Sequence, residues 1–170
     1  LLAMDESYDE ATCAALIERF VEAGTWSVPT LLVQRFLVVD PDDPRLRYLA
    51  PEERVYWDGL LDGQAEAYPE DPRFEALHHE IAAAMHRAGV KILAGSDAGV
   101  PGAFAGFGLH DELGWLVRIG MTPAEALRAA TLGPAEFFEA TDSLGTVAEG
   151  KAADLVLLDA NPLDDITNTQ

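Results

Sequence analysis

The chain has 170 residues, of which 49% are hydrophobic, and 30 acidic against 11 basic residues give it a formal net charge of −19. The apolar fraction is enough to bury a core, so composition excludes a disordered chain. The excess of acids argues against a nucleic-acid partner, because phosphate binding needs clustered Lys and Arg. We interpret the charge as favouring solubility. No uncharged apolar run is long enough to cross a bilayer, so no membrane partner is expected.

The beginning of the chain predicts a helix followed by a short strand. Ser7 and Glu10 have the spacing of a capping box that opens a helix, and Gly24 is a suitable C-terminal cap. Residues 25–33 are strand-like, with a break expected at Pro29 because proline removes a ladder donor. Cys13, the only cysteine, excludes an intramolecular disulfide and a cysteine zinc site, and we expect it to be a small core residue.

A long, acidic, proline-rich connection follows over residues 34–72, with a short helix expected from about Glu52 to Tyr68. It carries the aromatic residues Phe36, Tyr48, Tyr56, Trp57 and Tyr68. Connections of this length are often functional, so the segment is either a lid over a pocket or an insertion on the surface. The sequence leaves both interpretations open.

The middle of the chain predicts a helix and then a buried strand. Phe74, Leu77, Ile81, Met85 and Ala88 recur at helical spacing, and Gly89 ends the helix. Residues 90–95 form a continuous apolar run, which is typical of a buried parallel strand. Because helices and strands alternate along the chain, we expect an α/β fold with parallel strands.

The last third of the chain predicts helices and then a hairpin. A helix is expected over 110–119, and Thr122 with Glu125 forms a capping box for the next helix, which Pro134 interrupts or restarts. From Leu144 the pattern changes, and residues 155–158 resemble one strand of a hairpin.

Asp97 is the sharpest candidate for chemistry, because it follows the predicted strand directly and lies between Gly95 and Gly99. In parallel α/β folds the carboxyl ends of the strands carry the active site. A carboxylate there can bind a divalent metal or act as a general base, and the glycines allow the backbone to approach a ligand closely. Asp97 could equally cap the next helix or accept hydrogen bonds from loop amides. A phosphate cradle is disfavoured, because no Gly-Lys-Ser/Thr follows.

The four histidines are less informative. His78, His79 and His86 share one predicted helix, without a His-Glu-x-x-His motif or a third ligand at obvious spacing, and we interpret them as solvated helix residues. His110 follows the glycine-rich loop and opens a helix just after Asp97. It therefore either faces the same pocket as Asp97 or has a capping or packing role.

Four blocks, in this order, resemble the amidohydrolase superfamily, and within it the imidazolonepropionase-like and prolidase-like branch. They are Gly-Ser-Asp-Ala-Gly at 95–99, Leu-His-Asp-Glu-Leu at 109–113, residues 120–131 and residues 144–158, with Asn-Pro-Leu following at 161–163. Each block alone is a weak signal, but the four in order are specific. The resemblance covers the chain from about residue 90 to about residue 165, and is loose before that.

The resemblance implies a (β/α)8 barrel with a small β-sandwich built from both chain ends. It also implies one or two divalent metals, usually zinc, that activate water for hydrolysis. Asp97 matches the family's aspartate at the end of the eighth barrel strand, which binds metal and takes the proton of the attacking water. His110 matches a recurrent histidine after that strand, and we carry it over, with Gly99, as a substrate-binding position.

The family's His-x-His motif and its later Lys or Glu and His ligands have no match in this sequence. We therefore expect a C-terminal fragment, with residues 1–143 ending the barrel, 34–72 as the long loop, and 144–170 forming part of the sandwich. One carboxylate cannot assemble a zinc site that needs three or more ligands, so the fragment alone is expected to be inactive. The parent protein is expected to hydrolyse a carbon–nitrogen bond in an amide, cyclic amide or dipeptide-like substrate.

Two other hypotheses stay open at this point. One is a non-catalytic relative that serves as a binding or structural module, which the absence of upstream histidines would favour. The other is a barrel enzyme, such as a lyase, that uses a strand-end Asp without metal. For the hydrolase hypothesis, the expected partner is a small-molecule substrate, and the formation of a homo-oligomer is left open. A cytoplasmic location is favoured, with export left open because the chain begins at Leu1 rather than Met.

Overall fold

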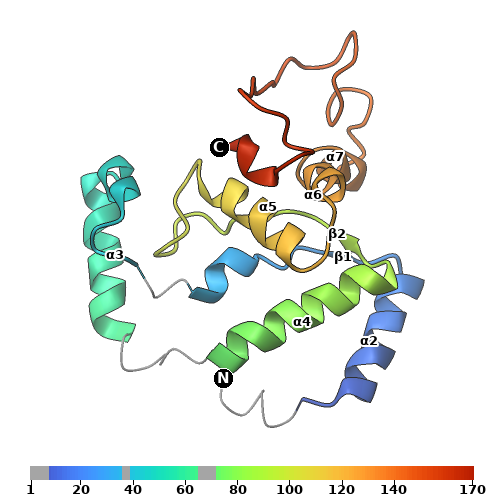
Figure 1. Ribbon diagram of the computed structural model, residues 1–170, viewed down its shortest axis with the longest axis horizontal. Coiled ribbons are helices and arrows are strands. Elements are labelled where there is room, and N and C mark those ends of the chain that lie inside the picture. Colours follow the sequence, from blue (N-terminus) through green and yellow to red (C-terminus); the bar gives the residue numbers. More distant parts are fainter. Residues whose placement is uncertain (1–7, 36–38, 65–71) are drawn as a thin grey trace.

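A pair of short parallel strands lies between two groups of helices in the computed structural model, which describes residues 8–35, 39–64 and 72–170 (Figure 1). The elements in chain order are α2 (Glu10–Glu22), β1 (Trp26–Ser27), the 3-10 helices η1 (Leu31–Arg35) and η2 (Pro44–Tyr48), α3 (Pro51–Gln64), α4 (Pro72–Ala88), β2 (Lys91–Ile92), α5 (Gly108–Arg118), α6 (Pro123–Ala130), α7 (Leu132–Phe137) and the 3-10 helix η3 (Ile166–Thr169). The strands lie between α2 and α4 on one side and α5 to α7 on the other.

The strands β1 and β2 are parallel, with Trp26 opposite Lys91 and Ser27 opposite Ile92. The N–H of Leu93 donates to the carbonyl of Ser27 at 2.8 Å and continues the pairing beyond β2. The expected parallel α/β arrangement is confirmed in this pair. In the described part of the chain the sheet has these two strands.

The strand predicted over 25–33 is too long, because β1 ends at Ser27. Pro29 has no N–H to donate to a ladder, and Thr30 has a φ of 45°, which no strand residue adopts. The chain then turns into η1 at Leu31, whose side chain is buried in the core. The expected break at Pro29 is therefore the end of the strand.

The first helix begins at Glu10 and is capped by Asp9, whose carboxylate accepts a hydrogen bond from the N–H of Thr12 at 2.7 Å. The predicted capping box is thus replaced by an Asp9 cap, and Ser7 lies outside the described residues. Gly24, with a φ of +64°, follows the helix as expected. Cys13 is half-buried against the core, in agreement with its predicted role.

The core lies where α4, β2, α5 and α6 meet. Its buried members are Ile17, Leu31, Ala82, Met85, Val90, Ile92, Leu113, Leu116, Met121, Ala126, Ala129 and Ile166. The helix predicted to end at Gly89 is α4, and Ile81 and Met85 of its predicted apolar stripe pack in this core. Phe74 and Leu77 are half-buried outside this cluster, and Ala88 in the final turn is exposed.

The helices α5, α6 and α7 follow the sequence closely. The predicted capping box is present, with the N–H of Glu125 donating to Thr122 Oγ1 at 3.2 Å and the N–H of Thr122 donating to Glu125 Oε2 at 2.7 Å. The α6 helix ends at Ala130, and α7 starts at Leu132. Pro134 is tolerated there because N–H groups in a first helical turn have no intrahelical acceptor.

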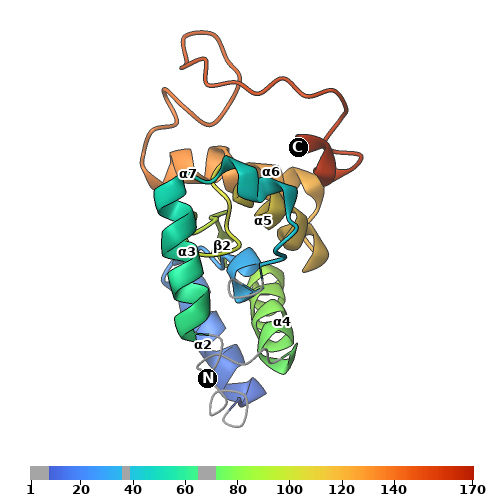
Figure 2. The ribbon, with the colours of Figure 1, turned by 90° about the vertical axis from the view of Figure 1, so that its left-hand side faces the viewer.

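The hairpin predicted from Leu144 onward is wrong for this structure, because residues 144–165 contain no strand. Figure 2 shows this segment looping away from the helices before it returns at η3. Its apolar residues are open to solvent, with Val156 77% and Leu157 99% exposed. A strand needs a paired neighbour, and the described residues offer none to this run. Lys151 fixes the nearer turn by donating to the carbonyl of Thr141 at 2.6 Å and to Thr146 Oγ1 at 2.7 Å.

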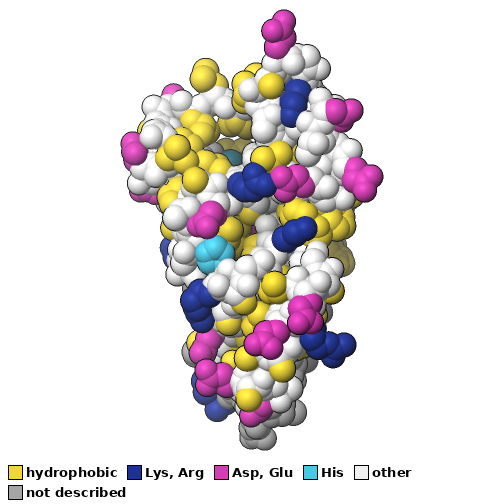
Figure 3. Space-filling model, turned by 90° about the vertical axis from the view of Figure 1, so that its right-hand side faces the viewer, with side chains coloured by type: hydrophobic (Ala, Val, Ile, Leu, Met, Phe, Trp, Pro, Cys, Tyr) yellow, Lys and Arg dark blue, Asp and Glu magenta, His cyan; other side chains and the backbone are white. Residues whose placement is uncertain are grey.

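The surface mixes charges of both signs with apolar side chains. On the face seen in Figure 3, Lys and Arg are scattered among Asp and Glu. Within the described ranges, no helix has the length and apolarity needed to cross a membrane.

We predict that Gly95→Ala destabilises the protein, because a Cβ at Gly95 would lie 2.4 Å from Val28 Cγ1 and 3.4 Å from Thr30 Cγ2. Overpacking of this kind costs about 1–3 kcal/mol. Gly114→Ala in α5 is the matched control, because nothing lies within 4 Å of its new Cβ. The control should stabilise the helix by about 0.5–1 kcal/mol. Chemical denaturation of the complete protein measures both, and equal effects of the two substitutions would contradict the close approach.

Candidate active site at the carboxyl ends of the strands

Two residues with positive φ lie where the parallel strands end. Thr30 follows β1 with a φ of 45°, and Asp97 follows β2 with a φ of 47°. A side-chain-bearing residue in this region costs of order 1–2 kcal/mol, so the surrounding structure has to hold it there. Such strained positions cluster at active sites and ligand clamps. The strand end that sequence analysis singled out, at Asp97, is therefore also a place where the backbone is strained, and so is the neighbouring strand end at Thr30.

Asp97 is exposed, and its carboxylate makes no hydrogen bond or ion pair with any other described residue. It does not cap α5, whose N-cap is Phe107 without a side-chain hydrogen bond. The two structural roles considered for Asp97 are thus absent from the described part of the chain. The carboxylate is left free to act on a ligand.

The loop after β2 folds back on itself next to Asp97. The N–H of Gly99 faces the carbonyl of Ala103 at 3.4 Å, and the N–H of Ala103 donates to the carbonyl of Val100 at 3.0 Å. The carbonyl of Gly99 accepts a hydrogen bond from Trp57 Nε1 at 3.2 Å. Gly99, predicted to bind substrate, therefore has its backbone engaged by the loop and by α3.

The long connection packs against this loop. Trp57 is 2% exposed, and its ring lies 5.0 Å from that of Phe104. Tyr48 lies 5.4 Å from Phe107 in the same way. Among the other aromatic residues singled out, Tyr56 is exposed, whereas Phe36 and Tyr68 lie outside the described residues. The η2 and α3 part of the connection thus covers the loop that follows Asp97.

Arg45 holds the connection to α5 electrostatically. Its Nη1 donates to Asp111 Oδ2 at 2.7 Å, its Nη2 donates to Asp43 Oδ2 at 2.8 Å, and its guanidinium lies 4.5 Å from the centre of the Phe104 ring. The hydrogen bonds from Arg45 lower the pKa of Asp43. One cation thus joins η2, the loop after β2 and the first turn of α5.

His110 is half-buried in the first turn of α5, and its Nδ1 is buried without a hydrogen-bond partner among the described residues. It makes no capping hydrogen bond at this end of the helix. The start of α5 packs on the segment of Asp97, because a Cβ at Gly108 would lie 3.1 Å from Ser96 Cβ. The structure therefore brings together the two segments that carry Asp97 and His110.

The histidines of α4 are packed rather than solvated, which corrects the sequence interpretation. His78 lies edge-on to Phe74 at 4.0 Å, and burial lowers its pKa. His79 lies 4.6 Å from the Trp115 ring. Among the residues that the structure describes, no three or more His, Cys, Asp and Glu side chains are grouped closely enough to hold a metal. Asp97 fits one position of a metal site, because its free carboxylate supplies an oxygen ligand of the kind that zinc accepts.

Glu112 is the residue that sequence reasoning missed. It lies on α5 with an exposed fraction of 0%, and its Oε2 accepts a hydrogen bond from the N–H of Leu32 at 3.0 Å. Its Oε1 is buried with no partner among the described residues. Burial raises the pKa of Glu112 to about 7, although the backbone N–H groups of Leu31 and Leu32 oppose this. The available signal was its place beside Leu113 and Leu116 on the apolar face of the helix.

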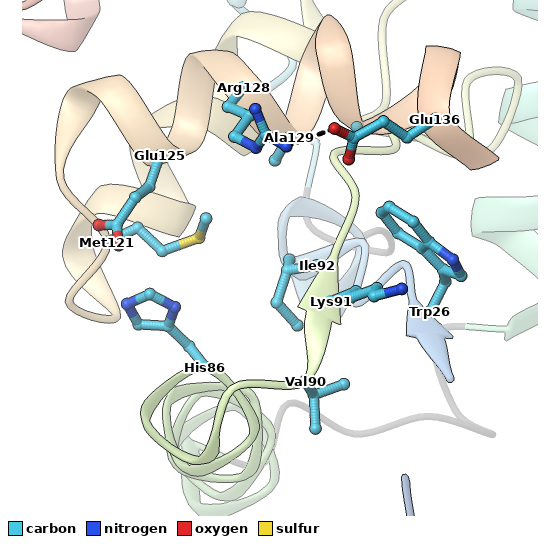
Figure 4. A pocket seen from close by; sticks show the side chains of 11 residues that line it. Trp26, His86, Val90, Lys91, Ile92, Met121, Glu125, Arg128, Ala129 and Glu136 are labelled. Carbon is cyan, nitrogen blue, oxygen red and sulfur yellow. Dashed lines mark hydrogen bonds and ion pairs between the residues drawn. The ribbon is translucent and has the colours of Figure 1, made fainter. Parts of the chain in front are cut away.

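A separate pocket of about 330 Å³ lies at the opposite, amino end of the strands (Figure 4). Val90, Lys91 and Trp26 line it from the strands, and His86 lines it from α4. Across the pocket Arg128 is paired with Glu136 at 2.5 Å. In parallel α/β folds, active sites form at the other end of the strands, so we do not place the chemistry here.

Trp57→Phe should loosen the loop after β2 without removing its cover. The ring still packs on Phe104, but the hydrogen bond to the carbonyl of Gly99 is lost, which costs about 1 kcal/mol. Trp57→Ala should cost about 3–5 kcal/mol, because it also removes the buried ring. Chemical denaturation and hydrogen exchange over residues 98–104 measure these effects. Tyr56→Phe, at a neighbouring exposed ring, is the control, and an equal response from Tyr56→Phe and Trp57→Phe would refute the contact.

Glu112 should make stability fall as pH rises. The folded protein keeps a proton on Glu112 up to a pKa of about 7, whereas the unfolded chain releases it near the ordinary glutamate pKa of 4.5. Because the folded state binds more protons between these values, the wild type should lose about 3 kcal/mol across this window. Glu112→Gln stays neutral and should remove this loss. Denaturation free energies at about pH 5 and about pH 8 measure it. Glu149→Gln, at an exposed position, should keep the wild-type slope, and an unchanged slope in Glu112→Gln would disprove the assignment.

Both the sequence and the structure of this chain are similar to those of known proteins. The sequence model of the amidohydrolase family matches residues 65–170. Adenine deaminase 2 of Rhizobium johnstonii is 48% identical over 54 residues, which is 32% of this chain and 9% of the deaminase.

Among solved structures, a Xaa-Pro dipeptidase with bound methionine in the active site aligns with a TM-score of 0.63 at 24% identity, over 90% of this chain and 33% of the dipeptidase. Molinate hydrolase aligns with a TM-score of 0.55 at 26% identity, over 90% of this chain and 31% of that chain. A structure described as an amidohydrolase aligns with a TM-score of 0.59 at 25% identity, over 95% of this chain and 33% of that chain. The chain thus spans about a third of these structures. The family model covers more than half of the chain and agrees with the four sequence blocks, and the chain belongs to the amidohydrolase family.

Proposed function

We propose that the complete protein is a metal-dependent hydrolase that cleaves a carbon–nitrogen bond in a small molecule, such as an amide, a cyclic amide or a dipeptide-like compound. Family membership supports hydrolysis, and the similar proteins include a deaminase and a dipeptidase by name. Because the chain spans about a third of the solved structures it resembles, the rest of the protein would complete the site.

The observation that carries the proposal is the state of Asp97. Its carboxylate follows the parallel strand β2, is exposed, and has no hydrogen-bond partner among the described residues. An unused carboxylate at the carboxyl end of such a strand is suited to ligand binding and to proton transfer.

Asp97 would supply one ligand to a divalent metal, with zinc as the expected ion, and the remaining ligands would come from outside this chain. A bound metal of this kind lowers the pKa of water and polarises the bond to be cleaved. The metal count, one or two, depends on those other ligands. By this argument residues 1–170 alone would be inactive, because a catalytic zinc site needs three protein ligands.

The other residues of the site would bind and orient the substrate. The Asp97 carboxylate would take the proton of the attacking water as general base. His110 would contact the substrate, since its Nδ1 has no hydrogen-bond partner among the described residues. Gly99 would contact it through the open side of its Cα, where nothing lies within 4 Å of an added Cβ, because its N–H and carbonyl are engaged by Ala103 and Trp57. Within the expected barrel portion, residues 1–143, the long connection 34–72 would act as a lid that excludes water. Its packing on the loop after β2 supports that role, with residues 144–170 assigned to the sandwich.

Asp97→Asn tests the function, because the substitution keeps the shape of the side chain and removes its charge and basicity. In the complete protein we expect a lower zinc content and a loss of turnover of about 10²–10⁴-fold, the range of a general base. Elemental analysis and hydrolysis assays with amide and dipeptide substrates measure the two effects. Asp154→Asn, at an exposed position in the tail, is the control.

Unchanged zinc content together with unchanged hydrolysis in Asp97→Asn would overturn the assignment. Activity that persists in the presence of a chelator would instead favour a metal-independent barrel enzyme such as a lyase. A complete protein that binds no metal and hydrolyses none of these substrates would favour a non-catalytic binding or structural module.

A further inference from the structure

We propose that Glu112 is a positioning residue of the candidate active site, and that its buried carboxyl group holds the turn after β1, residues 30–32, in the place where this turn forms one wall of the site. The contact itself is independent of the proposed function. Its effect on turnover rests on that function.

A hydrogen bond joins α5 to the turn. Glu112 and Leu32 are 80 residues apart in the chain, and Glu112 Oε2 accepts the N–H of Leu32 at 3.0 Å. The first N–H groups of a helical segment have no partner within it, so the start of η1 needs an outside acceptor. With an exposed fraction of 0%, Glu112 supplies that acceptor from inside the core.

The turn at residues 30–32 is strained and needs contacts that hold it in place. Thr30 has a φ of 45°, a conformation that costs free energy and persists only where neighbouring contacts fix it. Within the turn the N–H of Val33 donates to the carbonyl of Thr30 at a relatively long 3.2 Å. The hydrogen bond to Glu112 lies between these two residues. It is therefore well placed to fix the strained turn.

The turn packs against the segment that carries Asp97. A Cβ at Gly95 would meet Val28 at 2.4 Å and Thr30 at 3.4 Å, so the turn packs directly on Gly95, in the segment after β2 and two residues before Asp97. A Cβ at Gly108 would meet Ser96 at 3.1 Å and Leu32 at 3.5 Å. The turn, the segment of Asp97 and the start of α5 thus form one packed unit, and displacement of the turn would move the wall beside Asp97.

The burial of the Glu112 carboxyl group costs free energy unless the group makes a contact that the fold needs. Glu112 Oε1 is buried without a partner among the described residues, and such an oxygen carries a desolvation penalty that an apolar side chain would avoid. The apolar residues Leu113 and Leu116 occupy the same helix face. A leucine at position 112 would suit the core better, but it would leave the N–H of Leu32 without an acceptor. The hydrogen bond to Leu32 therefore explains why a carboxyl group occupies this core position.

The test compares Glu112→Leu, which removes the acceptor, with Glu112→Gln, whose side-chain carbonyl can still accept from Leu32. Leu116→Ala is the matched control, because it destabilises the same helix by a cavity and leaves Glu112, the acceptor of the Leu32 N–H, in place. Hydrogen exchange of the complete protein is measured over residues 30–33 and 95–99. We expect about tenfold or faster exchange at both segments in Glu112→Leu, protection close to wild type in Glu112→Gln, and no specific change there in Leu116→Ala.

The kinetic readout is kcat and KM, measured separately for whichever substrate the complete protein hydrolyses. Misplaced site walls cost turnover, so Glu112→Leu should lower kcat by about tenfold or more, with rescue by Glu112→Gln and a smaller effect of Leu116→Ala. Unchanged exchange at Leu32 in Glu112→Leu would overturn the contact. Faster exchange at residues 30–33 without any change at 95–99 would overturn the link to the site. A wild-type protein without hydrolase activity would overturn the proposed function alone, because both exchange results would still stand.

Discussion

The parallel pairing of β1 with β2 is the contact on which the rest of the structure depends. Only a parallel pair brings two carboxyl ends to the same edge, and here it sets the turn at Thr30 beside the loop of Asp97. The helices α4, α5 and α6 then bury the strands from both sides through Ile92 and its core neighbours. The site therefore follows from the topology, and the side chains at the edge decide its chemistry.

Around this edge, segments far apart in the chain are joined by polar contacts of different strength. Glu112 reaches the turn from within the core, where low polarity strengthens its hydrogen bond and raises its pKa. Arg45 and Trp57 reach the next loop from the long connection, closer to solvent. The buried hydrogen bond from Leu32 to Glu112 positions the turn on one side of the candidate site. The contacts of Arg45 and Trp57 hold the long connection over the loop on the other side.

Local signals predicted much of the fold, and contacts between distant residues account for what they missed. The Thr122 capping box and the helix ends at Gly24 and Gly89 were predicted because they depend on a few adjacent residues. The strand after Gly24 was predicted too long, and the hairpin near 155–158 was wrong, because strand formation depends on a partner that no local pattern reveals. In the candidate site, the position of Asp97 was predictable from the buried strand before it. Glu112 was not, since its acceptor role depends on Leu32, 80 residues away.

The exposed tail has a consequence for the behaviour of the chain in solution. Leu155, Val156 and Leu157 form a short apolar run of high strand propensity that is 63–99% exposed and has no neighbouring strand in the described structure. Such runs recruit one another across molecules into intermolecular sheets. Asp154 and Asp159 flank this run on either side, and charges in these positions act as gatekeepers that oppose self-association. Asp154 and Asp159 thus oppose intermolecular association through the exposed apolar run 155–157.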